Sequence, residues 1–259
     1  MSIAVITGAS SGLGAEYVKA AAEQFPQIDT FWLIARRKER MEELAEKFPQ
    51  KNFCILPMDL ANGENLEVLS QKLAAEKPQI ELLINCSGFG VVGDTDSSHY
   101  TRQVSMVDVN CRALTAISAM CVPYMAKPGL IVNVSSIAAF MPIAGMNVYS
   151  ATKSFVLSFS KALRRELKKK GINVIAVCPG PMNTEFFGVA GISVEAIAQR
   201  SNLLTALPWV DPAKLTVKSL KKGKKGKSVY TARFIYKLYR VLAALIPDRI
   251  FMKFLYLKP

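Results

Sequence analysis

The chain has 259 residues, 51% of them hydrophobic, and a formal net charge of +13. This length and apolar content exclude a disordered chain and fit one large domain with a full core. The charge is uneven, because residues 212–259 hold 13 basic residues and one acidic residue, a net of +12, whereas residues 1–211 hold a net of +1. Such a cationic segment raises the question of a nucleic acid or an anionic membrane as partner.

The histidine and cysteine content limits which metal sites and catalytic groups the protein can have. His99 is the only histidine, which argues against a zinc site built on several histidines and against a Ser-His-Asp triad, so we expect no bound metal. The five cysteines form no CxxC pair and are typical of reduced thiols in a cytosolic protein. The chain opens on an apolar run without a cationic leader, and it holds no run of about 18 uncharged apolar residues. We therefore expect a cytoplasmic protein without a membrane-spanning helix.

Six continuous apolar runs of strand length lie between residues 3 and 178. Runs that are apolar throughout are typical of parallel strands buried on both faces, and amphipathic segments with helical spacing separate them. This alternation predicts a single doubly wound α/β domain of the Rossmann type over residues 1–259, with a parallel sheet of about seven strands flanked by helices. The predicted strands are Ile3–Thr7, Phe31–Ala35, Phe53–Met58, Ile80–Asn85, Leu130–Ser135 and Asn173–Cys178, and the predicted helices are Gly14–Phe25, Lys38–Phe48, Asn65–Glu76, His99–Met125 and Tyr149–Lys170.

The last fifth of the chain continues the same alternation. Asp211 followed by Pro212 is typical of a helix start and predicts a helix to about Leu220. Residues 232–259 are expected to form amphipathic helices, the first with a cationic face and an apolar face. The other predicted elements are a basic turn over Lys221–Lys227, a strand over Ser228–Thr231 and a short helix over Arg249–Leu257. The cationic face holds Arg233, Lys237 and Arg240, and the apolar face holds Phe234, Leu238, Val241, Leu242 and Leu245.

A glycine-rich loop joins the first predicted strand to the first predicted helix. Its sequence over Thr7–Gly14 is TGASSGLG. Glycines let the backbone turn sharply and approach a pyrophosphate, which the free N–H groups and the dipole of the helix N-terminus stabilise. A glycine pattern alone is weak evidence, but a strand before it and a helix after it favour a dinucleotide site. A tight strand-to-helix turn without a ligand is the alternative.

The residues after the second predicted strand bear on the choice of dinucleotide. In dinucleotide-binding units an acidic residue near this place binds the ribose hydroxyls, whereas arginine pairs with a 2′-phosphate. Ala35 stands where the acid is expected, and Arg36 and Arg37 follow it. This favours NADP(H) over NAD(H). The alternative is that the two arginines are the solvated start of a helix.

A serine, a tyrosine and a lysine have a spacing that suits proton transfer. Tyr149 and Lys153 are four residues apart and would share one face of a helix. A tyrosine has a pKa of about 10, which a neighbouring ammonium lowers by stabilising the phenolate. Ser136 follows the fifth predicted strand, and open α/β sheets bind ligands at strand ends. These residues form a candidate acid/base site, although a Tyr-x-x-x-Lys spacing by itself is usually structural.

Seven short segments lie in a fixed order along residues 2–190: Thr7–Gly14, Met58–Leu60, Asn85–Gly88 (NCSG), Asn110, Ser136, Tyr149–Lys153 (YSATK) and Pro179–Thr184 (PGPMNT). With this set the sequence resembles the short-chain dehydrogenase/reductase family, whose motifs include TGxxxGxG, NNAG and PGxxxT. Cys86 and Ser87 replace the usual Asn-Ala, and Met182 replaces a branched residue. Neither departure removes a catalytic group.

The resemblance implies a mechanism. Tyr149 is expected to be the general acid or base, and Ser136 to stabilise the developing alkoxide. Lys153 is expected to bind the nicotinamide ribose and to lower the pKa of Tyr149, while Asn110 holds a water that links Lys153 to solvent. The residues expected to bind the cofactor are Gly8, Ser10, Ser11, Gly12, Leu13, Gly14, Arg36, Arg37, Asp59, Leu60, Asn85, Ser87, Gly88, Tyr149, Lys153, Pro179, Gly180, Met182 and Thr184.

The cationic last fifth has three interpretations. It completes the sheet and caps the cleft, as in similar members of the family, or it attaches the protein to an anionic membrane. The third interpretation is nucleic-acid binding, but no recognised motif accompanies the charge, so we expect no nucleic-acid partner. The apolar side chains proposed to enter a membrane interface are Phe234, Leu238, Leu242, Phe251, Phe254 and Leu255.

The predicted function is an NADP(H)-dependent oxidoreductase that interconverts a ketone and a secondary alcohol. A substrate loop at about residues 185–210 holds few charges, which favours a hydrophobic substrate such as a steroid, a bile acid or a lipid-like ketone. Core packing explains the same composition equally well. A 3-oxoacyl thioester reductase and a non-catalytic cofactor-binding regulatory protein are the alternatives. The resemblance also implies a homodimer or homotetramer through the helices His99–Met125 and Tyr149–Lys170.

Overall fold

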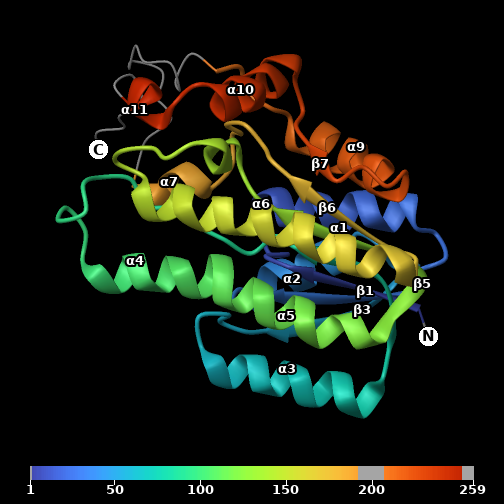
Figure 1. The fold of residues 1–259 in the computed structure, drawn as a ribbon. Helices are drawn as coiled ribbons and strands as arrows, with labels where there is room; N and C mark the ends of the chain where they lie inside the picture. The colour runs from blue at the N-terminus through green and yellow to red at the C-terminus, as the bar shows by residue number, and fades with distance from the viewer. Residues whose placement is uncertain (1, 192–206, 253–259) are drawn as a thin grey trace.

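Continuous apolar runs form a sheet that is covered on both faces. The computed structural model describes residues 2–191 and 207–252 (Figure 1). All seven strands are parallel, in the order β3-β2-β1-β4-β5-β6-β7, which confirms the doubly wound Rossmann-type prediction. The strands are β1 Ser2–Thr7, β2 Thr30–Ala35, β3 Asn52–Pro57, β4 Gln79–Asn85, β5 Met125–Val134, β6 Ile172–Val177 and β7 Val229–Tyr230.

Two helical layers cover the sheet (Figure 1). Side chains of α1 (Gly12–Gln24), α2 (Lys38–Ala45) and α9 (Pro212–Lys224) pack against one face. Those of α3 (Gly63–Glu76), α5 (Leu114–Cys121) and α6 (Asn147–Leu167) pack against the other. The chain order reverses between the neighbours β1 and β4, so a crevice forms outside their carboxyl ends. The other helices are α4 Tyr100–Val107, α7 Phe186–Ala190, α10 Phe234–Leu245 and α11 Asp248–Phe251.

The long helix predicted over His99–Met125 is not continuous. Between α4 and α5 the segment Asp108–Ala113, η1, is a π-helix, and the short 3-10 turn η2 (Val122–Tyr124) follows α5. The side chain of Asn110 in η1 exchanges two hydrogen bonds with the backbone of Phe89, at 3.0 and 3.1 Å. The π-helical turn thus coincides with a contact between Asn110 and the loop after β4. Such turns are frequent at functional sites.

The start predicted for the basic turn over Lys221–Lys227 is wrong, because α9 continues to Lys224. Leu220 and Gly223 lie on the buried face of this helix, and a Cβ on Gly223 would approach Leu130 and Ile175 of the sheet. The glycine therefore serves packing rather than a turn. The substrate loop predicted over 185–210 and the helix predicted over Arg249–Leu257 lie partly outside the described residues.

A buried polar cluster lies between the sheet and the layer formed by α5 and α6. The amide of Asn85 donates to Asn133 at 2.8 Å and to Ser118 at 3.1 Å, and Asn133 donates to Ser160 at 3.0 Å. All four residues are buried. The cluster fixes the ends of β4 and β5 against the helices, because a buried amide that loses its partner costs free energy.

The variant Asn133→Ala should lower the free energy of unfolding by about 2 kcal/mol or more, because Asn85 and Ser160 each lose a buried partner. Denaturant unfolding measures the loss. Asn52→Ala, at an exposed position of β3, is the control and should change stability by less than about 0.5 kcal/mol. Equal stability of the two variants would contradict a structural role for the cluster.

Candidate active site

A cleft of about 820 Å³ opens at the carboxyl ends of the strands. Its walls come from the segments that follow β1, β2, β3, β4, β5 and β6, together with residues from α4, α6 and α10. The cleft brings together nearly all of the predicted site residues, although they are spread over residues 8–184. Asn85 and Asn110 do not line it. Asn85 turns instead into the buried polar cluster.

The glycine-rich loop has the geometry of a phosphate cradle. Gly8 has a φ of +71°, and a Cβ there would lie 2.9 Å from the backbone nitrogen of Ser87. The hydroxyl of Thr7 accepts the N–H groups of Cys86 and Ser87, both at 3.0 Å, so the ends of β1 and β4 are joined. Helix α1 begins at Gly12 with its N-terminus in the cleft. The loop therefore fits the pyrophosphate of a dinucleotide.

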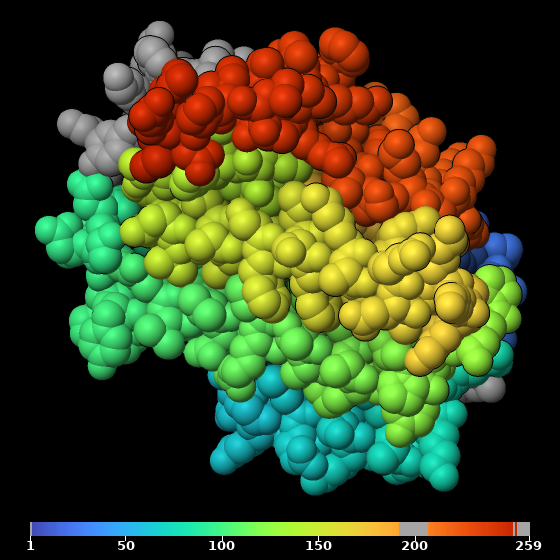
Figure 2. Space-filling view, viewed as in Figure 1, coloured from blue at the N-terminus to red at the C-terminus, as the bar shows by residue number. Residues whose placement is uncertain are grey.

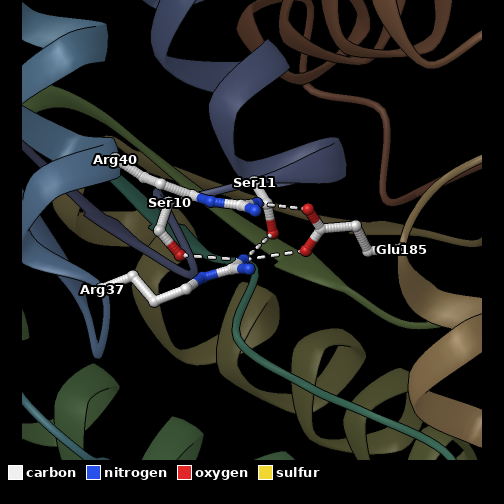
Figure 3. Close-up of polar contacts among 5 residues, drawn as sticks. All are labelled: Ser10, Ser11, Arg37, Arg40 and Glu185. Atoms are coloured by element: carbon white, nitrogen blue, oxygen red, sulfur yellow. Dashed lines mark hydrogen bonds and ion pairs between the residues drawn. The ribbon is translucent and has the colours of Figure 1, made fainter.

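Charged side chains gather at one end of this cradle (Figure 3). Arg37 donates to Ser11 at 2.6 Å and forms an ion pair with Glu185 at 2.9 Å, while Arg40 pairs with the other oxygen of the same carboxylate. Ser10 lies 3.5 Å from Arg37. Arg36 is exposed and also lines the cleft. We refer to Arg37, Arg40 and Glu185 as the arginine clasp. Arg40 and Glu185 were not among the predicted site residues.

Ser136, Tyr149 and Lys153 all line the cleft. Helix α6 carries Tyr149 and Lys153 one turn apart, with the Lys153 ammonium 5.7 Å from the centre of the Tyr149 ring. Lys153 Nζ donates to the carbonyl of Val134 at 3.0 Å. Ser136 follows β5, and its hydroxyl lies near enough to Tyr149 to lower the pKa of the phenol. This arrangement can deliver a proton to a substrate oxygen held between the tyrosine and serine hydroxyls.

Burial controls the protonation of this group. It raises the pKa of Tyr149 to about 12, against the smaller lowering effect of the hydrogen bond with Ser136. The lowered pKa that the resemblance implied for Tyr149 is therefore absent from the protein alone, and the phenol is protonated at neutral pH. Burial also lowers the pKa of Lys153 to about 8. The thiol of Cys86 has its pKa raised to about 12 by burial, as expected of an inert packed cysteine.

Asn110 lies behind the cleft and acts on the residues that line it. Its amide holds the backbone of Phe89 and donates to the hydroxyl of Thr152 at 3.0 Å. A Cβ on Gly88 would lie 2.9 Å from Asn110 Oδ1 and 3.1 Å from Lys153 Nζ. Glycine at this position therefore lets the loop after β4 lie directly against the lysine and the asparagine.

One part of the cleft, which we call the outer cleft, is lined by the aromatic residues Phe186, Phe187 and Trp209 and by other apolar side chains. Phe186 packs on Tyr149 with 5.4 Å between ring centres, and Phe187 packs on Trp209 at the same distance. Tyr239 reaches the cleft from α10. Phe186 and Phe187 lie in the substrate loop predicted over residues 185–210, whereas no sequence signal marks Tyr239 as a cleft residue, because α10 is distant in the chain. The remaining apolar lining residues include Phe89, Val92, Ile143, Met146, Val189 and Leu207.

Residues 2–191 match the family model of the short chain dehydrogenases. The chain belongs to the short-chain dehydrogenase family. A relative in this family, the serine 3-dehydrogenase of Agrobacterium fabrum, is 34% identical over 188 residues, which cover 70% of this chain and 72% of that protein. The glycine betaine reductase ATRR of Emericella nidulans is 33% identical over 195 residues. That match covers 73% of this chain but only 15% of the length of the reductase.

Solved structures of short-chain dehydrogenases have the same fold over nearly the whole chain. An enzyme of Sphingobium yanoikuyae, in complex with NADPH, is 29% identical with a TM-score of 0.78 and covers 98% of this chain and 96% of its own. The bulky-bulky ketone specific alcohol dehydrogenase of Comamonas testosteroni is 27% identical with a TM-score of 0.74, covering 98% and 94%. Short-chain dehydrogenases are oxidoreductases that bind a nicotinamide dinucleotide, and the cleft holds the loop for it.

Burial of Lys153 should make stability depend on pH. The folded protein loses the lysine proton near pH 8, whereas the unfolded chain keeps it to about 10.5, so the cost of burying the charge disappears as pH rises between these values. Relative to Lys153→Met, the wild type should gain about 2 kcal/mol between about pH 7.5 and about pH 9.5. Urea unfolding of both proteins measures the difference. A constant difference would show that Lys153 keeps its ordinary pKa.

Proposed function

We propose that the chain is an NADP(H)-dependent oxidoreductase that interconverts a ketone and a secondary alcohol on a hydrophobic substrate. The observation that carries the proposal is the meeting of Ser136, Tyr149 and Lys153 in a cleft that also holds the phosphate-binding loop. The likeness to an NADPH complex and to a ketone-specific alcohol dehydrogenase supports it.

The cofactor would lie along the carboxyl edge of the sheet. The loop from Gly8 to Gly14 would hold the pyrophosphate against the start of α1. Asp59 and Leu60 would flank the adenine, and the segment Pro179–Thr184 would border the nicotinamide. Arg36 and Arg37 would bind the 2′-phosphate of NADP(H), since guanidinium groups suit phosphate oxygens. When bound, the nicotinamide of NADP(H) supplies or accepts the hydride.

The protein's own part in the reaction is proton delivery and positioning. In ketone reduction Tyr149 donates its phenol proton to the carbonyl oxygen, for which its raised pKa keeps it protonated. Ser136 donates a hydrogen bond to the same oxygen and stabilises the developing negative charge. Lys153 carries its ammonium beside the Tyr149 ring and favours the phenolate after the proton has left. Asn110 fixes the loop that lies against Lys153. It would also hold a water molecule that relays protons between Lys153 and solvent.

The lining of the outer cleft supports a bulky apolar substrate. Phe186 packs on Tyr149, Phe187 packs on Trp209, and buried apolar residues continue the wall. Such a surface desolvates a ketone and offers few polar partners to a charged molecule. A steroid, a bile acid or a lipid-like ketone fits this character. A panel of such ketones with NADPH, followed by loss of NADPH absorbance, would identify the substrate.

Tyr149→Phe should lower the turnover of the best ketone by about 10²- to 10⁴-fold, because the variant has no proton to donate. NADPH binding, measured by fluorescence titration, should stay within about twofold, since the phenol is not needed to hold the phosphates. Tyr124→Phe, at a half-buried position of η2 outside the cleft lining, is the control and should keep full activity. Full activity of Tyr149→Phe would contradict the catalytic assignment, and loss of NADPH binding would show a folding defect instead.

We also propose that α10 attaches the enzyme to an anionic membrane. The predicted apolar face of this helix points outward, because Tyr236, Tyr239 and Ala243 form its buried face. Phe234 and Leu245 are 77% and 74% exposed. The other exposed apolar residues of the face are Ile235, Leu238, Val241 and Leu242. None of the helices within residues 2–191 and 207–252 is long and apolar enough to cross a membrane.

Cationic residues lie beside this face. Arg233, Lys237 and Arg240 are exposed along one side of α10. Figure 2 shows α9, α10 and α11 as one continuous surface along the top of the molecule, and α9 ends in Lys221, Lys222 and Lys224. An apolar stripe flanked by basic residues suits an interface with anionic lipid headgroups, each cation contributing up to about 1 kcal/mol. The enzyme would thus be a cytoplasmic protein that meets apolar ketones at the bilayer.

The double variant Phe234→Glu/Leu238→Glu should bind mixed phosphatidylcholine and phosphatidylserine vesicles at least about tenfold more weakly than the wild type, because two apolar side chains leave the interface. Co-sedimentation measures the binding. Val68→Glu, on α3 and 51% exposed in the wild type, is the matched control and should bind normally. Equal partitioning of the wild type with and without phosphatidylserine would refute the membrane proposal.

We also propose that the chain forms a homodimer or homotetramer. Exposed apolar residues on the outer surfaces of α4 and α6 support it, since these helices are the ones expected to pair. They are Tyr100, Val104, Val107 and Phe155. Sedimentation equilibrium would give the number of copies.

A further inference from the structure

A single carboxylate holds both arginines of the clasp. Glu185 Oε2 lies 2.9 Å from Arg37 Nη2, and Oε1 pairs with Arg40 Nη1 (Figure 3). Arg37 follows β2 and Arg40 lies in α2, whereas Glu185 comes from the segment after β6. The two guanidinium groups lower the pKa of Glu185, with Arg40 the stronger partner. The carboxylate is therefore ionised at neutral pH.

The groups around Glu185 form a site for a larger anion. Two guanidinium groups converge on it, and the hydroxyls of Ser10 and Ser11 lie beside them and accept from Arg37. Such a set of donors suits a phosphate dianion, which accepts more charge-assisted hydrogen bonds than a carboxylate. The clasp also lies beside the glycine-rich loop at the end of β2, where dinucleotide-binding units place the 2′-substituent of the adenosine ribose.

We propose that Glu185 discriminates between the two nicotinamide dinucleotides by competing with the 2′-phosphate for Arg37 and Arg40. The inference rests on the proposed function and assigns a specificity residue within it. A 2′-phosphate must break the two ion pairs of Glu185 before it can bind, whereas a ribose hydroxyl leaves them in place. Glu185 therefore weakens the preference for NADP(H) that the arginines alone would give.

The clasp is open enough for this exchange. The side chains of Arg37, Arg40 and Glu185 are all between 42% and 46% exposed, so solvent reaches both ion pairs. Ion pairs with this exposure stabilise a structure only slightly, because water screens them. A dianion with several charge-assisted hydrogen bonds can displace the carboxylate, and the cost of doing so corresponds to a few-fold loss of affinity.

The position of Glu185 in the chain connects the clasp to the substrate half of the cleft. Glu185 directly precedes α7, whose Phe186 packs on Tyr149 and whose Phe187 packs on Trp209. We therefore expect release of the carboxylate to shift the start of α7 and the aromatic rings that it carries. Trp209 reports on this movement, because its indole ring contacts Phe187.

The deciding experiment compares adenosine 2′,5′-bisphosphate with adenosine 5′-monophosphate, which differ only in the 2′-phosphate. Calorimetry should show that Glu185→Gln binds the bisphosphate about 3- to 10-fold more tightly than the wild type, with little change for the monophosphate. Glu42→Gln is the matched control, since it removes an exposed carboxylate that pairs with Lys38 on α2. It should leave both affinities near those of the wild type. An unchanged affinity ratio in Glu185→Gln would overturn the proposal.

Tryptophan emission tests the connection to α7. Adenosine 2′,5′-bisphosphate should change the tryptophan emission of the wild type, and this change should vanish in Trp209→Phe. The change should be smaller in Glu185→Gln, where no ion pair holds the start of α7. No change in the wild type would overturn this part of the proposal.

The cofactor assignment is judged separately by titration of the wild type with NADPH and NADH. A wild type that binds only NADH would contradict the NADP(H) assignment. Even then, a gain of NADPH affinity in Glu185→Gln would support the proposed role of Glu185. No gain of NADPH affinity in this variant would overturn that role.

Discussion

The buried ammonium of Lys153 is the constraint around which the rest of the site is arranged. A charged group taken out of water needs polar partners, and the carbonyl of Val134 at the end of β5 supplies one at 3.0 Å. The hydroxyl of Ser135 donates to the carbonyl of Lys153 at 2.7 Å, so the same strand end also holds the backbone of α6. Tyr149, one helical turn away, is fixed as a consequence. The catalytic geometry is therefore set by the junction of β5 and α6.

Most of the fold follows from local sequence signals. Strands buried on both faces are apolar throughout, which makes them visible without any knowledge of their neighbours. Caps mark helix starts in the same way, and the carboxylate of Asp211 accepts the N–H of Lys214 at 3.1 Å at the start of α9. The site residues of the motifs likewise follow strand ends, which is why nearly all of them meet in one cleft.

The features that sequence reasoning missed depend on contacts between distant segments. The arginine clasp joins residues 145 and 148 positions apart, and its formation requires the segments after β2 and β6 to meet. The π-helical turn at Asn110 depends on the backbone of Phe89, and the length of α9 depends on the space beside Leu130 and Ile175 that Gly223 leaves. An amphipathic pattern also predicts two faces of a helix but does not determine which of them is buried. In α10 the tyrosine side packs inward and the aliphatic side faces out.

The two faces of α10 make this helix sensitive to its rotation about its own axis. Tyr239 lines the cleft on one side while Leu238, its neighbour in the chain, is exposed on another. Each residue turns an α-helix by about 100°. One residue inserted or deleted between β7 and α10 would therefore carry Tyr239 out of the cleft wall and turn part of the aliphatic stripe toward the sheet. The length of the short connection at residues 231–233 thus sets both the shape of the pocket and the character of the outer surface, so relatives with a connection of another length would differ in both at once.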